Sequence, residues 1–170
     1  MDNIEYLKAA DYWNDKDKSG KKAPPEQILR AAEQIFTACK NCALATGHAD
    51  YVRCTPVDYT YHDGAFWIFT EGGQKFLSLR SNKNVSLAIY DTAGTFDNLK
   101  SVQVMGTAEL IEPFSDEYVR NAELRKIPIA TLKKLTYPMY LLKITPSEII
   151  LLDTSFKQQG YDSREIWRAQ

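Results

Sequence analysis

Short β-forming runs separated by tight turns dominate this chain. Residues 51–62 are rich in β-branched and aromatic side chains, and Asp63-Gly64 predicts a hairpin turn into a second such run, 65–70. One face of the first run, at a period of two, carries Tyr51, Arg53, Thr55, Val57, Tyr59 and Tyr61. Further strands are predicted at 42–47, 84–91, 100–112, 139–145 and 148–153. Because few helices interrupt these strands, we expect a mainly β, antiparallel barrel with flanking helices.

Two predicted helices flank the first strands. Pro25 suits the first turn of an amphipathic helix that extends to about residue 40. After the second strand, the Gly72-Gly73 pair leads into a short helix over residues 73–80. Its predicted inward-facing side chains are Phe76, Leu77 and Leu79.

The remaining boundaries follow from local signals. Ser115 is the predicted N-cap of a helix over 116–126, and another helical turn follows Pro128. Pro146 separates the last two predicted strands, where its missing N–H does no harm. Because residues 15–23 are charged and aperiodic, we expect an exposed, mobile linker there. The predicted division is therefore an N-terminal segment and linker, 1–23, and one domain, 24–170.

Charge and hydropathy exclude several functional classes. The formal net charge of −1 gives no overall field that would attract nucleic acid or an anionic membrane surface. The first residues have no apolar core of signal-peptide length, and no run approaches the ~20 apolar residues of a membrane span. We therefore expect a cytoplasmic protein that binds neither nucleic acid nor membrane.

The three cysteines are predicted to be reduced, because an odd number without an export signal argues against a disulfide framework. Cys39 and Cys42 match the redox motif C-x-x-C, but they fall at a helix end, where the dipole does not favour a thiolate. We interpret them as small buried hydrophobic residues. No metal site is predicted, because Cys54, His48 and His62 lack the spacing of metal ligands.

Residues 53–75 also combine groups that suit a phosphate. Arg53 offers a planar pair of donors, Lys75 a mobile charge and Thr70 a hydroxyl. The start of the following helix adds unpaired backbone N–H groups and a favourable dipole. We therefore predict that Arg53 and Lys75 converge on one bound phosphate.

These motifs resemble the pyridoxamine 5′-phosphate oxidase-like flavoproteins of the FMN-binding split-barrel superfamily, and a bacterial branch of it in particular. The resemblance covers roughly residues 26–153 and rests on R-x-T-P-V at 53–57, F-T-x-G-G-x-K at 69–75, SLAIYD at 86–91 and VQVMGTAEL at 102–110. It implies a split β-barrel of Greek-key-like order. It further implies a homodimer with FMN as cofactor at the subunit interface.

The resemblance also assigns roles to particular residues. Arg53, Thr70 and Lys75 resemble the phosphate-binding residues, and Pro56 belongs to the stretch that lies against the flavin ring. The implied cofactor-binding residues are Arg53, Cys54, Thr55, Pro56, Val57, Phe69, Thr70, Gly73, Lys75, Ser101 and Gln103.

The residues leave plainer interpretations open. Pro56 also suits an ordinary edge strand, Arg53 a solvated position and Lys75 the surface of a helix. Ser101 and Gln103 also suit the solvent-facing side of an alternating strand.

Several positions depart from the true oxidases. Asp58 stands where those enzymes carry a substrate-binding lysine, and Gln74 where they often have arginine. Their C-terminal signature is not recognisable around Trp167 and Arg168, a tail that suits a subunit contact, a cap on the site or a frayed end. We therefore do not expect pyridoxamine 5′-phosphate to be the substrate.

The predicted function is that of an FMN-dependent oxidoreductase that passes electrons through flavin N5, from a reduced small-molecule donor to a small acceptor or oxygen. No catalytic side chain is assigned. The alternative is a non-catalytic flavin- or haem-binding protein of the same fold, for which His48 and His62 are the available axial ligands. A cofactor-free structural dimer is a third possibility.

Overall fold

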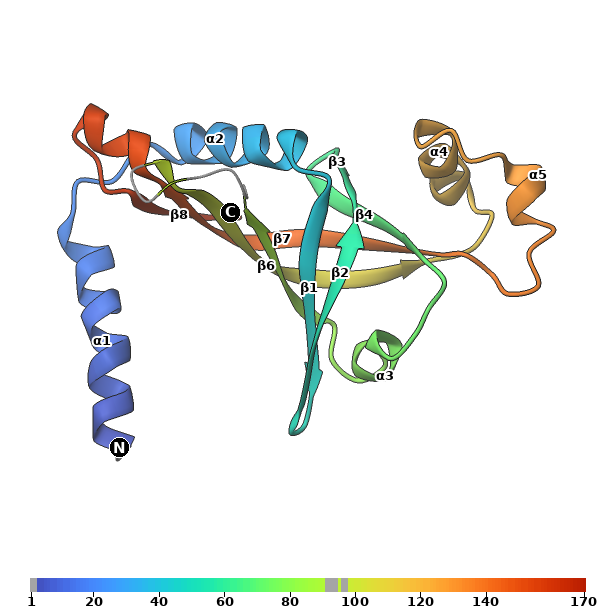
Figure 1. The fold of residues 1–170 in the computed structure, drawn as a ribbon, viewed down its shortest axis with the longest axis horizontal. Helices are drawn as coiled ribbons and strands as arrows, with labels where there is room; N and C mark the ends of the chain where they lie inside the picture. Colours follow the sequence, from blue (N-terminus) through green and yellow to red (C-terminus); the bar gives the residue numbers. More distant parts are fainter. Residues whose placement is uncertain (1–2, 91–94, 96–97) are drawn as a thin grey trace.

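The computed structural model describes residues 3–90, 95 and 98–170 (Figure 1). One curled antiparallel sheet forms the body, in the order β2-β1-β5-β6-β7-β4-β3, and β8 pairs with β7. The strands are β1 Asn41–His48, β2 Tyr51–Asp58, β3 Thr60–His62, β4 Ala65–Thr70, β5 Asn84–Tyr90, β6 Lys100–Ile111, β7 Tyr140–Asp153 and β8 Arg164–Arg168. This confirms the predicted mainly β architecture. Asp91, predicted as the end of a strand, lies outside the described residues.

One run of chain joins the two ends of this sheet. β2 pairs with β1 at one end of the order, β3 pairs with β4 at the other, and only Tyr59 separates β2 from β3. The predicted single strand over 51–62 is therefore interrupted. Tyr59 is buried there, and its hydroxyl donates to the Phe36 carbonyl oxygen over 3.0 Å. Because β2 and β4 are not paired neighbours, the barrel is split between them.

Helices lie at the ends and on one side of the sheet. They are α1 Asn3–Ser19, α2 Pro25–Ala38, α3 Lys75–Leu79, α4 Asp116–Leu124, α5 Ile129–Leu132 and the 3-10 helix η2 Thr154–Gln159. The predicted cap is confirmed, because the Ser115 side chain accepts from the Tyr118 backbone N–H at the start of α4. None of the described helices is long and apolar enough to cross a membrane.

The apolar residues form two cores. The larger lies between α2 and the inner face of the sheet, where Ile28 and Phe36 meet Leu44 and Leu87. The smaller packs α4 and α5 against the far ends of β4 and β7, around Tyr118. In Figure 1, α2 covers one end of the sheet while α4 and α5 stand at the opposite end.

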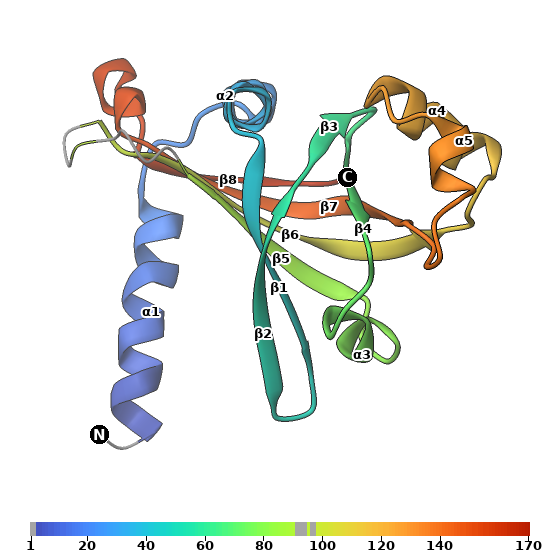
Figure 2. The same cartoon turned by 45° about the vertical axis from the view of Figure 1, so that its right-hand side comes forward.

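The predicted linker is wrong over residues 15–19, which continue α1 to Ser19. Asp17 forms an ion pair with Arg164, and the Lys22 ammonium lies 2.9 Å from the Asp162 carboxylate. These contacts hold the C-terminal end of α1 beside the β7–β8 connection, while its N-terminal end projects away from the sheet (Figure 2). Because Lys and Asp can pair along and across a helix, a charged segment need not be a coil.

The two predicted strands around Pro146 are one strand, β7, with an irregular register. The pairing shifts between Met105 and Gly106, where Gly106 faces Pro146 and Met105 faces Glu148. A bulge absorbs the proline, as expected for a residue that cannot donate to the ladder. Gly106 is required there, because a Cβ would lie 2.4 Å from the Thr145 carbonyl oxygen.

Two further predictions are corrected. The short helix α3 is five residues long and its Leu77 is 56% exposed, although Leu79 is buried as predicted. Of the alternatives left open for the C-terminal tail, a frayed end is excluded over residues 164–168, which form β8 with Trp167 opposite Ile149 of β7.

Candidate functional site

The alternation of β2 divides the predicted site residues between two faces of the sheet. Arg53, Thr55 and Val57 point inward and are half-buried, while Cys54 and Pro56 are exposed on the outer face. Successive side chains of a strand point to opposite faces. The residues predicted to bind the phosphate and those predicted to lie against the flavin ring are therefore on opposite faces of β2.

On the inner side, Lys75 and Arg53 lie close together. Lys75 is the first residue of α3, which packs against β1 and β2, and its side chain is only 6% exposed. Burial and the neighbouring Arg53 guanidinium lower the pKa of Lys75. Within residues 3–90, 95 and 98–170, neither cation forms an ion pair with a carboxylate. Buried charges in proteins are normally paired, so this arrangement leaves two cations ready for an anion.

Hydroxyl groups add spare hydrogen-bonding capacity on the same face. The Oγ1 atoms of Thr46 and Thr55 are buried and have no hydrogen-bond partner in the described part of the chain. Thr46 lies directly opposite Arg53 in the β1–β2 ladder. Thr70 is also buried, and its Oγ1 accepts from the Gly72 backbone N–H over 3.3 Å. We call Thr46, Arg53, Thr55, Thr70 and Lys75 the Lys75 cluster.

The glycine pair shapes the entry to α3. Gly72 and Gly73 have φ angles of +103° and +90°, values that residues with a Cβ rarely adopt. This turn brings the Gly72 carbonyl oxygen against the Lys75 ammonium, which donates to it. One carbonyl satisfies only one of the three donors of an ammonium. The chemistry of the Lys75 cluster, two cations with unpartnered hydroxyls, fits a phosphate monoester.

On the outer face, the strand register places the residues predicted to contact the flavin ring in one row across the sheet. Pro56 lies opposite Ala43, Ala43 opposite Ala88, and Ala88 opposite Gln103. Ser101 lies on the same face two residues away on β6. Small side chains between Pro56 and Gln103 leave a shallow strip about three strand spacings, or ~14 Å, across. A flat ligand can lie along such a strip.

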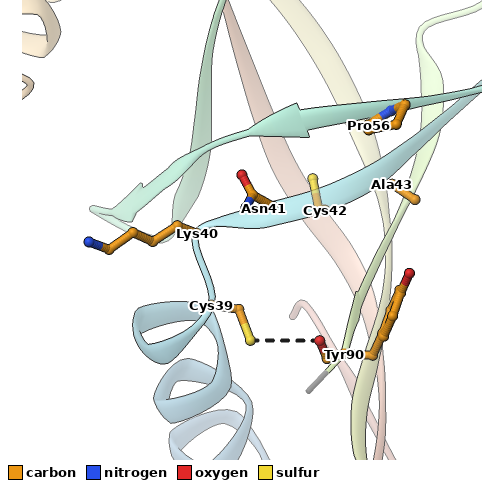
Figure 3. A pocket seen from close by; sticks show the side chains of 7 residues that line it. All are labelled: Cys39, Lys40, Asn41, Cys42, Ala43, Pro56 and Tyr90. Carbon is orange, nitrogen blue, oxygen red and sulfur yellow. Dashed lines mark hydrogen bonds between the residues drawn. The ribbon is translucent and has the colours of Figure 1, made fainter. Parts of the chain in front are cut away.

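A cavity of about 360 Å³ opens at the end of this strip (Figure 3). Pro56, Ala43 and Tyr90 line it from the sheet, and Cys39, Lys40, Asn41 and Cys42 line it from the junction of α2 and β1. The Cys39 thiol lies 3.9 Å from the Tyr90 carbonyl oxygen.

Phe69 does not join either group through its side chain. It packs in the smaller core, with its ring centroid 5.4 Å from that of Tyr118, while the next residue, Thr70, is buried on the opposite face of β4. Any contact of Phe69 with a ligand of the Lys75 cluster would therefore come from its backbone.

The cysteines do not have the environment of a redox pair. Burial raises the pKa of the Cys42 thiol to about 12, so the reactive thiolate is disfavoured at neutral pH. In the described ranges, no group of three or more Cys, His, Asp or Glu residues is placed to hold a metal ion.

Both histidines are engaged in hydrogen bonds. The two ring nitrogens of His62 face Asp63 Oδ2 at 3.2 Å and Asn121 Oδ1 at 2.9 Å. His48 Nδ1 lies 2.9 Å from the Ser78 hydroxyl oxygen. An axial haem ligand must offer a free ring nitrogen, so His62 is unsuited to that role.

Sequence reasoning missed two features of the site. Arg125, the C-cap residue of α4, forms an ion pair with Asp58, so the anion that replaces the family's substrate lysine is paired. Thr46 joins the Lys75 cluster only through its place opposite Arg53. The 67-residue separation of Asp58 and Arg125 explains why no local pattern pointed to their pairing.

Comparison with known proteins identifies the family and the fold of the chain. Residues 28–152 match the profile of the pyridoxamine 5′-phosphate oxidase family. No curated protein matches the sequence of the chain. Among solved structures, a FAD-binding protein from Mesorhizobium loti is 22% identical, with a TM-score of 0.56 over 71% of this chain and 89% of that chain.

Two other similar structures come from proteins of different description. General Stress Protein 26 from Bacillus anthracis is 20% identical, with a TM-score of 0.56 over 82% of this chain and 97% of that one. HutZ, the heme storage protein from Vibrio cholerae, is 16% identical, with a TM-score of 0.56 over 70% of this chain and 89% of that one. At these identities the similarity establishes a shared fold.

Proposed function

This chain belongs to the pyridoxamine 5′-phosphate oxidase family, and we propose that it binds FMN and serves as a flavin-dependent oxidoreductase with a substrate other than pyridoxamine 5′-phosphate. In this proposal the domain of residues 24–170 holds the flavin, and residues 1–23 form an N-terminal segment and linker that contact it through Asp17 and Lys22. The protein works in the cytoplasm.

The observation that carries the proposal is the proximity of two cations, Lys75 and Arg53, that form no ion pair among the described residues, beside the Thr46 and Thr55 hydroxyls, which have no hydrogen-bond partner there. A phosphate monoester bears nearly two negative charges and three acceptor oxygens. Arg53 would bind it with two donors, Lys75 with the donors that Gly72 leaves free, and Thr55 with its hydroxyl.

Because β2 is the end strand of the sheet order, one ligand would pass round its edge from the Lys75 cluster on the inner face to the outer strip. The flavin ring would then lie along that strip, with Pro56 and the small side chains of Ala43 and Ala88 beneath it. Gln103 and Ser101 would then offer hydrogen bonds to the polar edge of the ring and so bias its redox potential. An open strip covers only one face of a ring, so we propose that a second copy of the chain covers the other face in a homodimer.

When bound, the flavin supplies the electron chemistry: it accepts two electrons and a proton equivalent from a reduced donor and passes them to a small acceptor or oxygen. The side chains near it would bind, orient and exclude water. In the described part of the chain, the Asp58 carboxylate, two residues from Pro56 on β2, is paired with Arg125 and so is not a free acid or base.

A binding protein without turnover is the second candidate, and the pairing of Asp58 with Arg125 favours it. Haem is the other ligand in that case. His48 is then the candidate axial ligand, because both nitrogens of His62 are already engaged.

The visible absorbance spectrum of the purified full-length protein, before and after addition of FMN, tests the proposal. We expect the two bands of oxidised flavin, retained through gel filtration. A Soret band would identify the haem-binding alternative, and a colourless protein that does not retain added FMN would contradict both. Anaerobic mixing of the yellow protein with NADH or NADPH would then separate the enzyme from the binding protein, because only an enzyme using such a donor would be bleached rapidly.

A further inference from the structure

Helix α1 extends from the body of the protein with its side chains uncovered. Every residue from 4 to 16 is exposed. Tyr6 and Leu7 are each 64% exposed, and Trp13 is 48% exposed. Most of the stability of a helix in a protein comes from packing of an apolar face rather than from helix propensity. A helix with exposed aromatic residues is therefore expected to pack on a further surface, and exposed apolar patches commonly mark such interfaces.

The apolar side chains of α1 lie mostly along one side of the helix. Tyr6, Ala10 and Trp13 follow one another at spacings of four and three residues, and Leu7 lies three residues before Ala10. We call these four residues the α1 stripe. Asp17, four residues after Trp13, continues the same side of the helix.

Contacts at the C-terminal end of α1 fix the direction of the α1 stripe. Asp17 forms an ion pair with Arg164 of β8, and the Arg164 guanidinium carbon lies 5.8 Å from the centre of the Trp13 ring. Trp167 of β8 packs against the larger core on the inner face of the sheet. Because successive side chains of a strand alternate, Arg164, three residues earlier, points to the outer face. The α1 stripe is therefore attached to the outer face.

The arrangement of the elements agrees with this placement. In Figures 1 and 2, α1 and α2 lie on opposite sides of the sheet, and α1 projects to the same side as the β1–β2 hairpin. Pro56 and the rest of the outer strip are on this outer face as well. The second copy proposed to cover the flavin ring would therefore lie beside α1.

The area of the α1 stripe fits a two-fold dimer. Aromatic side chains bury ~150–250 Å² each, so the exposed parts of Tyr6, Leu7 and Trp13 amount to about 350 Å². A two-fold dimer buries two such helices and two receiving surfaces, ~1,400 Å² in all, which is within the range of stable interfaces. A single unrelated partner would bury about half of that, the size of a crystal-packing contact.

Charge favours a protein partner over a membrane surface. Residues 3–19 carry four acidic and three basic side chains: Glu5, Asp11, Asp15 and Asp17, and Lys8, Lys16 and Lys18. Helices that bind membrane surfaces are instead rich in Lys and Arg on their polar face. Because the helix is nearly neutral, two copies of it do not repel each other strongly.

We propose that α1 is an arm that packs the α1 stripe on a second copy of the chain, with each copy contacted by the arm of the other about a two-fold axis. The position of that copy on the outer face rests on the flavin dimer proposed above. The docking of α1 on a second copy does not require bound flavin.

Two double alanine variants of the full-length protein test the arm. Y6A/L7A truncates the α1 stripe and should raise the dissociation constant of the dimer about tenfold or more, because two apolar side chains are no longer buried. The matched control K8A/Y12A truncates two exposed residues on the other side of α1 and should stay within about twofold of the original protein. Analytical ultracentrifugation measures both. Because alanine is the best helix former, a loss in Y6A/L7A does not reflect lower helix propensity.

Hydrogen exchange tests whether α1 itself is covered. The backbone amides of residues 4–16 should exchange about tenfold or more slowly in the dimer than in protein diluted to the monomer, and Y6A/L7A should lose this protection. Equal weakening of the dimer by Y6A/L7A and K8A/Y12A would contradict the proposal. So would a protein that is monomeric at all concentrations, or a dimer whose α1 amides exchange as fast as those of the monomer.

Flavin content, read from the visible spectrum, is an independent result. A colourless protein that dimerises through α1 would refute the flavin proposal and support the arm. A yellow protein whose dimer is unaffected by Y6A/L7A would refute the arm and leave the flavin proposal standing.

Discussion

The Lys75 ammonium donates to the carbonyl oxygen of Gly72, three residues earlier, at the turn between β4 and α3. This bond turns a buried side chain back toward its own backbone and toward Arg53. It also leaves the ammonium without a described counter-ion. The first two predictions follow from that arrangement.

The double variant R53A/K75A should lose the ability to retain FMN. Each charge-assisted hydrogen bond contributes roughly 1.5 to 3 kcal/mol, so the loss of two weakens binding at least about a hundredfold. Riboflavin, which lacks the phosphate, should bind the original protein and the variant equally. Fluorescence titration measures both ligands, and tight FMN binding by the variant would disprove the phosphate site.

Replacement of Lys75 by Met should stabilise the flavin-free protein by about 1 kcal/mol, because a desolvated charge is removed. The same variant should weaken FMN binding by about tenfold or more, because one charge-assisted contact to the phosphate is lost. The folded-state pKa of Lys75 is lowered, so the native ammonium is disfavoured while it is protonated. As pH rises through that pKa the penalty disappears, so the gain should be largest near neutral pH and shrink toward pH ~10. Chemical unfolding at several pH values measures it, with the exposed Lys83→Met as control.

Gly106→Ala should destabilise the fold by about 1 to 3 kcal/mol, the range for overpacking. The added Cβ would meet the Thr145 carbonyl oxygen at 2.4 Å, and a backbone atom cannot swing away as a side chain can. Thr107→Ala, exposed on the same strand, should cost under about 0.5 kcal/mol. Urea unfolding compares the two, and equal stability would show that the β6–β7 bulge is not rigid.

Glu165→Gln should stabilise the protein more at pH ~8 than at pH ~4, with a difference of about 1 kcal/mol. The carboxyl is buried in β8, and burial raises its pKa above the usual value. Below the ordinary, unfolded-state pKa of about 4.3 both states hold the proton and the variant gains little. The penalty grows as pH rises from there to the raised folded-state pKa, above which the native state must bury a charge. Glu123→Gln, on the exposed face of α4, serves as the control.

Cys54 should react with a thiol reagent at pH ~8 in the native protein, whereas Cys42 should react only after unfolding. Cys54 is exposed, and burial raises the pKa of Cys42 to about 12. Mass spectrometry of labelled peptides distinguishes the two sites, and Cys54→Ser should remove the rapid phase. Rapid labelling of Cys42 would reopen the redox interpretation of the C-x-x-C motif.

Hydrophobic periodicity predicted most of the strands, because burial on one face imposes a period that the residues display. Periodicity failed for segments whose structure depends on contacts with residues far away in the sequence. β8 is short and half polar, and only its pairing with β7 makes it a strand. Residues 15–19 have the composition of a linker, but they continue α1, and Asp17 forms an ion pair with the distant Arg164.

Local motifs predicted the members of the site better than its geometry. Lys75 was expected to serve a phosphate or to be a surface lysine, and it is in fact buried, because the positive φ angles of Gly72 and Gly73 turn α3 toward the sheet. The pairing of Asp58 with Arg125 depends on where α4 packs, which no neighbouring residue specifies.

The β1–β2 hairpin, with its two-residue turn at 49–50, fixes which side of the sheet each β2 side chain faces. A single added or deleted residue in that turn would shift the register by one residue. Arg53 would then face the outer side of the sheet and Cys54 the inner side. Related proteins with this site are thus free to exchange side chains along the hairpin but not to change its length by an odd number. Length variation, rather than substitution, is the mutation class to which the hairpin is least tolerant.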